Sequence, residues 1–265
     1  MTIDTLNKKP LIEAICEIRW EFENENSLAN PNKQISLANL LEKIQNNYPV
    51  YEAISIPLFY LPGISVPVVE GFPLHRFRVA IEQWPLVQVG VGVVTVNETE
   101  NYAWENFSIR VIKVIQQIIE SHSQKGKIKI TSLMLKYIDA LDLNIESQNI
   151  YDFLREKLGL GITINPQLVN DNFLSDMPSD FNMSVSYKLK TSNLLNFKIL
   201  RGQKRDSQNN FAIEALILET TVTNTNHIQF DSIEESVKEW LKEAHSNTHD
   251  WFFTLVDGDL LETFK

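Results

Sequence analysis

Between Leu11 and Phe22 the chain alternates apolar and polar side chains, and this feature constrains the fold more than any other. The even-numbered positions from 12 to 20 are apolar, whereas Glu13, Glu17 and Arg19 lie between them. Successive side chains of a strand point to opposite faces, so the pattern predicts a half-buried strand with one face in water. A sheet of such strands has to bury its other face, and amphipathic helices are the elements that cover it.

Apolar periodicity predicts more strands along the chain. They are expected at Arg76–Gln83, Leu86–Val96, Lys127–Leu143, Met183–Leu189, Leu194–Leu200 and Phe211–Thr223. Leu86–Val96 is apolar on both faces except at Gln88 and Thr95, which is typical of a central strand. Four prolines interrupt Tyr51–Leu74, which predicts a long loop whose apolar residues pack on the core or meet a partner.

Helical spacing of apolar residues predicts four helices: Ser36–Tyr48, Tyr102–His122, Gln148–Leu158, and a C-terminal helix capped by Asp231 or Ser232 that ends at Leu255. In the second of these, Ile109, Ile112 and Ile119 widen the apolar stripe, which indicates burial on two sides or contact with another chain.

These elements define the predicted fold class. It is α+β, with a mostly antiparallel sheet or sheets packed by long amphipathic helices that include the C-terminal one. The whole chain, residues 1–265, is expected to fold as one unit, with residues 1–145 and 165–265 as two candidate halves.

Amino-acid composition limits the partners that the protein can bind and the cellular compartment in which it is expected. The 34 acidic against 24 basic residues give a net charge of −10, which repels phosphate backbones and disfavours nucleic-acid binding. Cys16 is the only cysteine and cannot form an internal disulfide, which fits a reducing compartment. The first nine residues lack a signal-peptide core, and no apolar run is long enough to span a bilayer. We therefore expect a cytoplasmic protein with no membrane role.

Two histidines on the C-terminal helix have the spacing of a zinc-binding pair. His245 and His249 are four residues apart, but Ser246 replaces the glutamate that a metalloprotease helix needs. No downstream histidine or cysteine offers a third ligand. The sequence therefore predicts no metal site and no cofactor.

Helical phase places Asp250 within the apolar stripe of the same helix. A buried carboxylate needs a partner, and Arg76, Arg78 and Lys136 are the candidates. We expect a structural ion pair rather than a catalytic acid, because paired structural carboxylates also have perturbed pKa values.

Polar residues also fall within the long strand predicted at Lys127–Leu143. Strand alternation places Lys136 and Asp142 on one face, and Tyr137 and Asp139 on the other. A lysine beside carboxylates is found in nuclease centres, but ordinary cross-strand ion pairs explain these residues with fewer assumptions. No phosphate-binding glycine loop or serine-nucleophile motif is present.

Several segments resemble successive blocks of a family. The opening Lys9–Trp20, Arg76–Arg78, Lys136–Ile138 and the closing Phe252–Asp257 are similar to blocks of a sporadically distributed prokaryotic family of about this length, to which no activity is assigned. The resemblance implies a single co-folded unit and an association with mobile-element or defence gene clusters. The family favours arginine at position 136 and asparagine at position 139, where this chain has lysine and aspartate.

The sequence favours a non-enzymatic binding or interaction component of a multi-protein bacterial system. The wide helix, the apolar Pro-rich loop and the missing catalytic motifs motivate this hypothesis. Candidate contact residues are Ile109, Ile112, Ile119 and Phe253, the last exposed by helical phase. We expect a protein partner or self-association as a homo-oligomer.

Two alternatives remain open. One is a metal-dependent hydrolase or nuclease that uses some of Asp139, Asp142, His245 and Asp250. The other is a small-ligand sensor with a cavity lined by tryptophans, of which the chain has five.

Overall fold

The computed structural model describes residues 6–22, 31–54, 72–99, 102–121, 128–143, 149–165, 167, 178–191, 193–205, 212–224 and 233–265. Most of the Pro-rich segment predicted as a loop, and the predicted helix caps Asp231 and Ser232, lie outside these residues.

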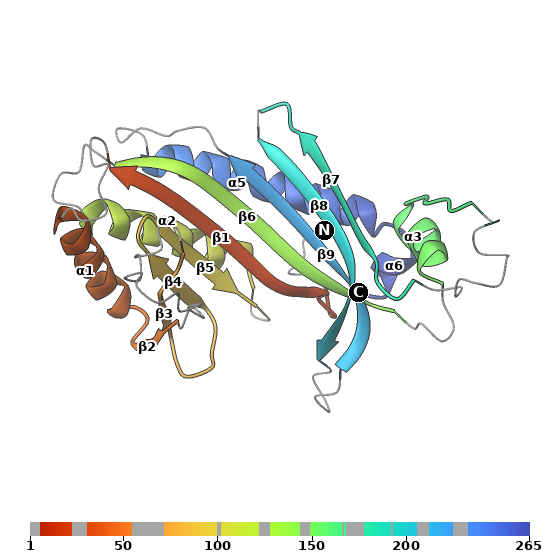
Figure 1. Cartoon of the computed structure of the whole chain (residues 1–265), viewed down its shortest axis with the longest axis horizontal. Helices are drawn as coiled ribbons and strands as arrows, with labels where there is room; N and C mark the ends of the chain where they lie inside the picture. The colour runs from red at the N-terminus through yellow and green to blue at the C-terminus, as the bar shows by residue number, and fades with distance from the viewer. Residues whose placement is uncertain are drawn as a thin grey trace, which may run out of the picture. The chain divides into compact units, whose positions relative to one another are not determined.

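The described residues form nine strands and five helices (Figure 1). The strands are β1 (Leu11–Phe22), β2 (Val50–Ala53), β3 (His75–Arg78), β4 (Leu86–Gly90), β5 (Val93–Glu98), β6 (Ile128–Asp142), β7 (Asn182–Lys188), β8 (Leu194–Arg205) and β9 (Ala212–Asn224). The helices are α1 (Pro31–Gln45), α2 (Trp104–Ser121), α3 (Ile150–Leu158), α5 (Ile233–Leu255) and α6 (Asp259–Glu262).

Hydrogen bonding orders the strands β2-β3-β4-β5-β1-β6-β9-β8-β7. Neighbouring strands are antiparallel in β2–β3, β3–β4, β4–β5, β1–β5 and β7–β8. The predicted α+β class with an antiparallel sheet and a C-terminal helix is therefore confirmed.

Residue contacts divide the chain into two compact units. The α2 unit contains Glu13–Leu135 and Thr223–Ala244. The α3 unit contains Met1–Ile12, Lys136–Val222 and His245–Lys265. Each unit takes residues from separate stretches of sequence, and β1, β6, β9 and α5 contribute residues to both.

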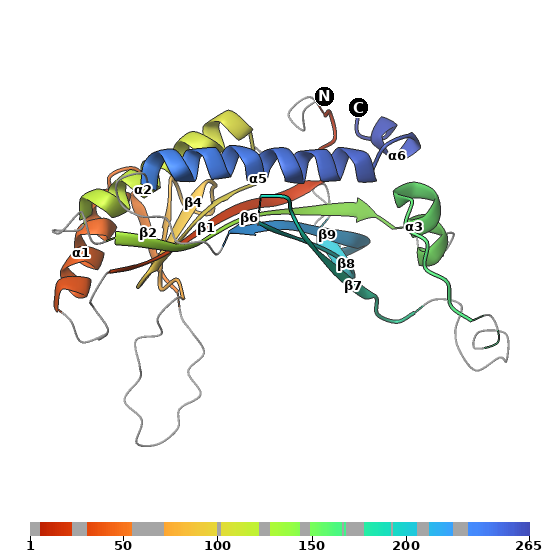
Figure 2. The ribbon, with the colours of Figure 1, turned by 90° about the horizontal axis from the view of Figure 1, so that it is seen from above.

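In the α2 unit, β1 shows the alternation read from the sequence. Ala14, Cys16 and Ile18 are fully buried, whereas Glu13 and Glu17 on the other face are half-buried. Helix α2 packs against β5 and α1 (Figure 2). The side chains that α2 buries include Phe107, Val111, Val114, Ile115 and Ile118. These residues recur every three or four positions, so one face of the helix forms part of the core.

The segment Leu86–Val96 is a hairpin, so the prediction of one central strand was wrong. Gly90 pairs with Val93, which leaves Val91 and Gly92 as a two-residue turn. Gly92 has φ of 70°, a conformation that glycine adopts without the steric cost of a Cβ atom. The prediction of an irregular chain from Tyr51 was also wrong at its start, because β2 pairs with β3 there.

In the α3 unit, helix α3 has the capping residues of a standard helix. The Asn149 side chain accepts a hydrogen bond from the Tyr151 amide, and Gly159 ends the helix with φ of 63°. The predicted end of this helix at Leu158 is thus confirmed. The short helix α6 follows Gly258 and was not predicted.

Two successive stretches of the chain repeat one order of elements. Each begins with a strand and a helix, continues with further strands and ends with a long helix: β1, α1, β2–β5 and α2 in the first stretch, and β6, α3, β7–β9 and α5 in the second. In the first stretch β1 pairs with β5, and in the second β6 neighbours β9. The sequence shows only a weak echo of this recurrence, since the pairing of strands is not visible in local periodicity.

Candidate functional site

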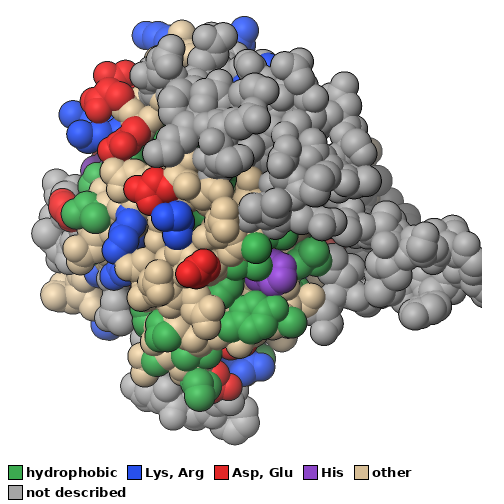
Figure 3. All heavy atoms as spheres, turned by 90° about the vertical axis from the view of Figure 1, so that its left-hand side faces the viewer, with side chains coloured by type: hydrophobic (Ala, Val, Ile, Leu, Met, Phe, Trp, Pro, Cys, Tyr) green, Lys and Arg blue, Asp and Glu red, His purple; other side chains and the backbone are tan. Residues whose placement is uncertain are grey.

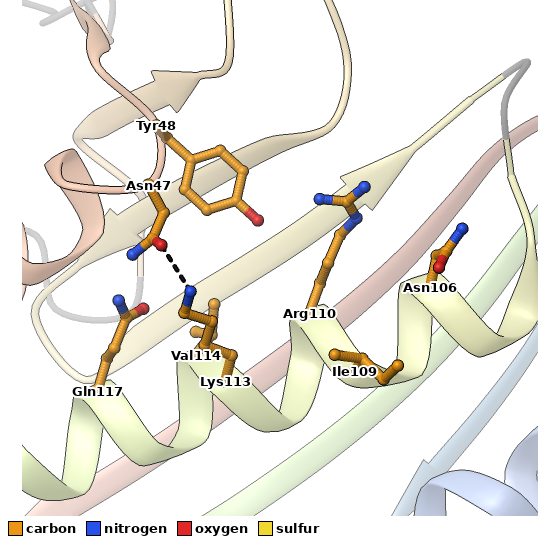
Figure 4. Close-up of a pocket in the computed structure, with 8 residues that line it drawn as sticks. All are labelled: Asn47, Tyr48, Asn106, Ile109, Arg110, Lys113, Val114 and Gln117. Carbon is orange, nitrogen blue, oxygen red and sulfur yellow. Dashed lines mark hydrogen bonds between the residues drawn. The ribbon is translucent and has the colours of Figure 1, made fainter.

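The residues that follow α1 and one side of α2 enclose a pocket of about 340 Å³ (Figure 4). This volume lies near the lower limit for small-ligand sites. The pocket lies within the α2 unit. It is lined by Asn47, Tyr48, Asn106, Ile109, Arg110, Lys113, Val114 and Gln117.

Helical spacing brings the α2 side chains together. Asn106, Arg110, Lys113 and Gln117 are three or four residues apart and therefore face the same side of the helix. Asn47 lies on the opposite wall, and its side-chain oxygen accepts a hydrogen bond of 2.6 Å from the Lys113 ammonium (Figure 4). This contact joins the two walls of the pocket.

The pocket carries an excess of positive charge. Arg110 lies 3.5 Å from the carboxylate of Glu98, which is only 4% exposed on β5. Lys113 has no carboxylate partner among the described residues. If each group has its usual charge, Arg110, Lys113 and Glu98 together carry one positive charge. The site therefore favours an anion.

Burial affects the ionisable groups of this wall. It raises the pKa of the Glu98 carboxyl, an effect that the nearby Arg110 partly opposes. Burial also raises the pKa of Tyr48, an effect that the nearby Arg110 again partly opposes. The Tyr48 phenol consequently stays protonated at neutral pH, and Figure 4 shows it pointing toward the guanidinium.

Two buried polar atoms of the pocket lack hydrogen-bond partners among the described residues. They are the Nε donor of Arg110 and the Oε1 acceptor of Gln117. Gln117 is only 8% exposed, and its amide nitrogen donates to the Lys43 carbonyl at 3.0 Å. Both atoms are shielded from solvent, and Nε is the Arg110 atom that faces the Glu98 carboxylate at 3.5 Å. Leaving a buried acceptor such as Gln117 Oε1 unpaired costs about 1–3 kcal/mol.

One of the candidate contact residues, Ile109, is strongly exposed. The Ile109 side chain is 66% exposed at the edge of the pocket, whereas Ile112 and Ile119 are half-buried. Phe253 was predicted to be exposed, but it is half-buried against the ring of His249, with ring centroids 4.6 Å apart. On the face in Figure 3, acidic, basic and hydrophobic side chains are interspersed across the described residues.

The arginines predicted to pair with Asp250 pair with Glu52 instead. Arg76 lies 3.4 Å and Arg78 3.2 Å from the Glu52 carboxylate, across the β2–β3 pair. Lys136 lies 3.7 Å from Glu219. These residues therefore form ordinary cross-strand ion pairs of partly exposed side chains.

Asp250 is not buried, so its predicted place in the apolar stripe was wrong. Its side chain is 75% exposed and bonds to His249 at 3.1 Å. The buried residues Thr248 and Phe252 lie two positions before and after it. Two positions correspond to about 200° around a helix, so Asp250 faces away from them.

Asp139, in the α3 unit, is the most buried carboxyl of the described residues. It is 1% exposed, and its Oδ1 has no hydrogen-bond partner among them. Burial raises its pKa to about 7. The predicted shared face with Tyr137 is confirmed, since both are buried while Lys136 and Asp142 are not.

In the same unit, the Tyr137 hydroxyl and His245 Nδ1 are 3.0 Å apart. The pKa of His245 is lowered to about 4, chiefly by burial and also by the neighbouring His249, while Asp250 opposes both effects. Among the described residues, no three His, Cys, Asp or Glu side chains are grouped so that they could hold a metal ion.

We expect His245 to make stability depend on pH. Its folded pKa lies below the unfolded value, so its contribution is complete above about pH 6.5 and is lost as pH falls toward 4. Lowering the pH from 8 to 5 should therefore cost wild type about 1 kcal/mol more than His245→Gln, after allowance for the partial exposure of the ring. Urea unfolding of both proteins at the two pH values measures this difference. Equal losses in the two proteins would contradict the prediction.

The sequence reasoning missed Tyr48, Arg110, Lys113 and Gln117 as site residues. A signal was present on α2, where polar residues at three- and four-residue spacing adjoin the apolar stripe. The other wall is about sixty residues earlier in the chain, so local periodicity cannot reveal the pocket. Of the five tryptophans proposed to line a cavity, Trp20 lines a second, smaller pocket of about 20 Å³.

Comparison with known proteins adds little to this site. No family model and no curated protein matches the sequence. Among solved structures, the TBP of Methanococcus jannaschii is similar at 12% identity, over 89% of this chain and 97% of the other, with a TM-score of 0.22. A likeness at that score supports no conclusion about fold or function. Within the described residues, no helix has both the length and the apolar character needed to cross a bilayer.

Proposed function

We propose that the chain is a non-enzymatic binding component that works with a protein partner, and that the α2 pocket holds an anionic group of that partner. The observation that carries this proposal is the excess positive charge of the pocket. As the resemblance to a sporadic prokaryotic family implies, the partner belongs to a multi-protein bacterial system linked to mobile-element or defence genes.

The composition of the pocket favours binding over acid–base catalysis. Its eight lining residues supply a guanidinium, an ammonium, a phenol, amides and aliphatic side chains. None of the eight is a His, Cys, Asp or Glu. General acid–base catalysis at neutral pH needs a group whose pKa lies near 7, whereas a guanidinium stays charged and the buried Tyr48 phenol stays protonated.

The exposed Ile109 favours a macromolecular partner over a free ion. A large aliphatic side chain that is 66% exposed beside a charged pocket offers contact area beyond the pocket itself. Protein contacts commonly combine such an apolar anchor with charged groups that set orientation.

The test is anion-dependent thermal stability. We expect sodium acetate, compared with sodium chloride at equal ionic strength, to raise the melting temperature of wild type by about 3 °C once acetate exceeds its Kd tenfold. Lys113→Gln should abolish the shift, because it removes the excess charge. Lys242→Gln is the matched control, since it removes an exposed lysine from α5. If acetate has no effect on wild type, or stabilises Lys113→Gln equally, the pocket is not an anion site.

A further inference from the structure

We infer that β7 is the contact between two copies of this chain, whose β7 strands pair antiparallel about a two-fold axis at Val185. The inference goes beyond the proposed function, because β7 lies in the α3 unit and takes no part in the α2 pocket. Three features of β7 carry it: its place at the end of the sheet, the direction of its backbone groups, and the symmetry of its sequence.

β7 is the last strand of the sheet, and among the described residues it pairs with β8 on one side and with no strand on the other (Figure 1). Sheet edges that resist pairing with another chain are commonly short or charged. The opposite edge strand, β2, has four residues, and its Glu52 pairs with two arginines. β7 has seven residues, and from Asn182 to Tyr187 it contains no charged residue and no proline. β7 is therefore the edge that is open to strand pairing.

The backbone groups of every second β7 residue point away from β8. At one end of the β7–β8 pair, the Leu189 amide donates to the Asn193 carbonyl at 2.8 Å. At the other end, the Arg201 amide donates to the Phe181 carbonyl at 2.9 Å. Both contacts continue the register of the pair, and bonded positions in an antiparallel pair recur every second residue. The odd-numbered residues of β7 therefore bond to β8, and the even-numbered residues from 182 to 188 direct their amides and carbonyls outward.

The β7 sequence fits a second copy of itself. When Val185 lies opposite Val185 of the second copy, every outward-facing residue meets an outward-facing residue, and each such pair can exchange two backbone hydrogen bonds. Ser184 then meets Ser186, and the cation Lys188 meets the neutral Asn182. This register pairs all seven residues of the strand and places no two like charges opposite each other.

The same register covers an exposed aromatic ring. Tyr187 is 51% exposed, although its ring contacts Trp251 of α5, with ring centroids 5.6 Å apart. Trp251 also contacts the buried Phe197 of β8, so α5 covers this face of the two strands. Met183 of the second copy lies opposite Tyr187, and a thioether beside an aromatic ring is a favourable contact. Pairing thus extends the apolar face that α5 already covers.

Sedimentation velocity of the full chain tests this pairing by exchange of charge. Ser184→Lys/Ser186→Lys sets cations opposite each other in both central pairs, and Ser184→Glu/Ser186→Glu sets carboxylates opposite each other. We expect wild type to form a dimer and each double variant to weaken it about tenfold. An equimolar mixture of the two double variants should restore the dimer, because each added cation then meets an added carboxylate.

Further variants separate the strand contact from general effects. Ser186→Pro removes an outward amide but no hydrogen bond to β8, so it should give a folded monomer. Glu235→Gln/Glu239→Gln changes the net charge by the same amount as the lysine variant, on exposed residues of α5, and should remain a dimer. Circular dichroism verifies that each variant is folded.

Three outcomes overturn the inference. A wild-type protein that stays monomeric at about 100 µM forms no such dimer. A dimer that persists unchanged in both double variants has its contact elsewhere. A mixture of folded double variants that stays monomeric shows that β7 of one copy does not meet β7 of the other. Each of these results leaves the anion site untouched, because the acetate response depends on the α2 unit.

Discussion

Asp139→Asn should stabilise the protein increasingly as the pH rises. Burial raises the pKa of this carboxyl to about 7, against an ordinary value of 3.8. Between these values the folded state binds more protons than the unfolded state, so wild-type stability falls as pH rises and levels off above pH 7. The advantage of the Asn variant should grow by about 3 kcal/mol from pH 5 to pH 8.

Urea unfolding at several pH values measures this change. A control on the same strand is Asp142→Asn, because the Asp142 side chain is 70% exposed and pairs with Lys204. We expect no comparable pH-dependent gain for the control. A constant difference between Asp139→Asn and wild type from pH 5 to pH 8 would show that Asp139 does not titrate in this range.

Gly90→Ala should destabilise the α2 unit by about 2–3 kcal/mol, because the strand has no room for a methyl group at this position. A Cβ atom there would lie 2.1 Å from the carbonyl oxygen of Phe72. A backbone atom cannot rotate away as a flexible side chain does, so the pairing of β4 would have to shift.

The matched control for this substitution is Gly161→Ala, where a Cβ atom meets no atom within 4 Å. We expect the control to change the free energy of unfolding by less than about 0.5 kcal/mol. Thermal or urea denaturation of both variants gives the comparison. Equal stability of Gly90→Ala and wild type would contradict the prediction, because it would mean that the backbone near Phe72 shifts at little cost in free energy.

The long elements could be predicted from sequence because their periodicity extends over many residues. The range of β1 agrees with the prediction, and those of α2, β6 and α5 agree to within two residues at each end. Over such lengths the alternation of a strand or the 3.6-residue repeat of a helix outweighs single exceptions. The shorter β2 and α6 were missed because four residues carry too little of either pattern.

The sequence-based predictions were wrong where one local pattern of apolar residues fits two different structures. The apolar run Leu86–Val96 is equally consistent with a long strand and with a hairpin, and the close approach of Phe72 to Gly90 is a tertiary contact. Asp250 was misplaced because the predicted stripe on α5 was drawn too wide. The width of a buried stripe depends on the elements packed against the helix, which the helix sequence does not contain.

The sequence by itself determined the α+β class, the positions of the long strands and helices, and the shared face of Tyr137 and Asp139. Local backbone geometry sets these features, and each can be read within one segment. Only the tertiary structure decided that Arg76 and Arg78 pair with Glu52, that Asp139 is enclosed, and that Tyr48 meets Arg110. Burial, ion pairing and pocket formation depend on residues distant in sequence, whose approach follows from packing and not from local propensity.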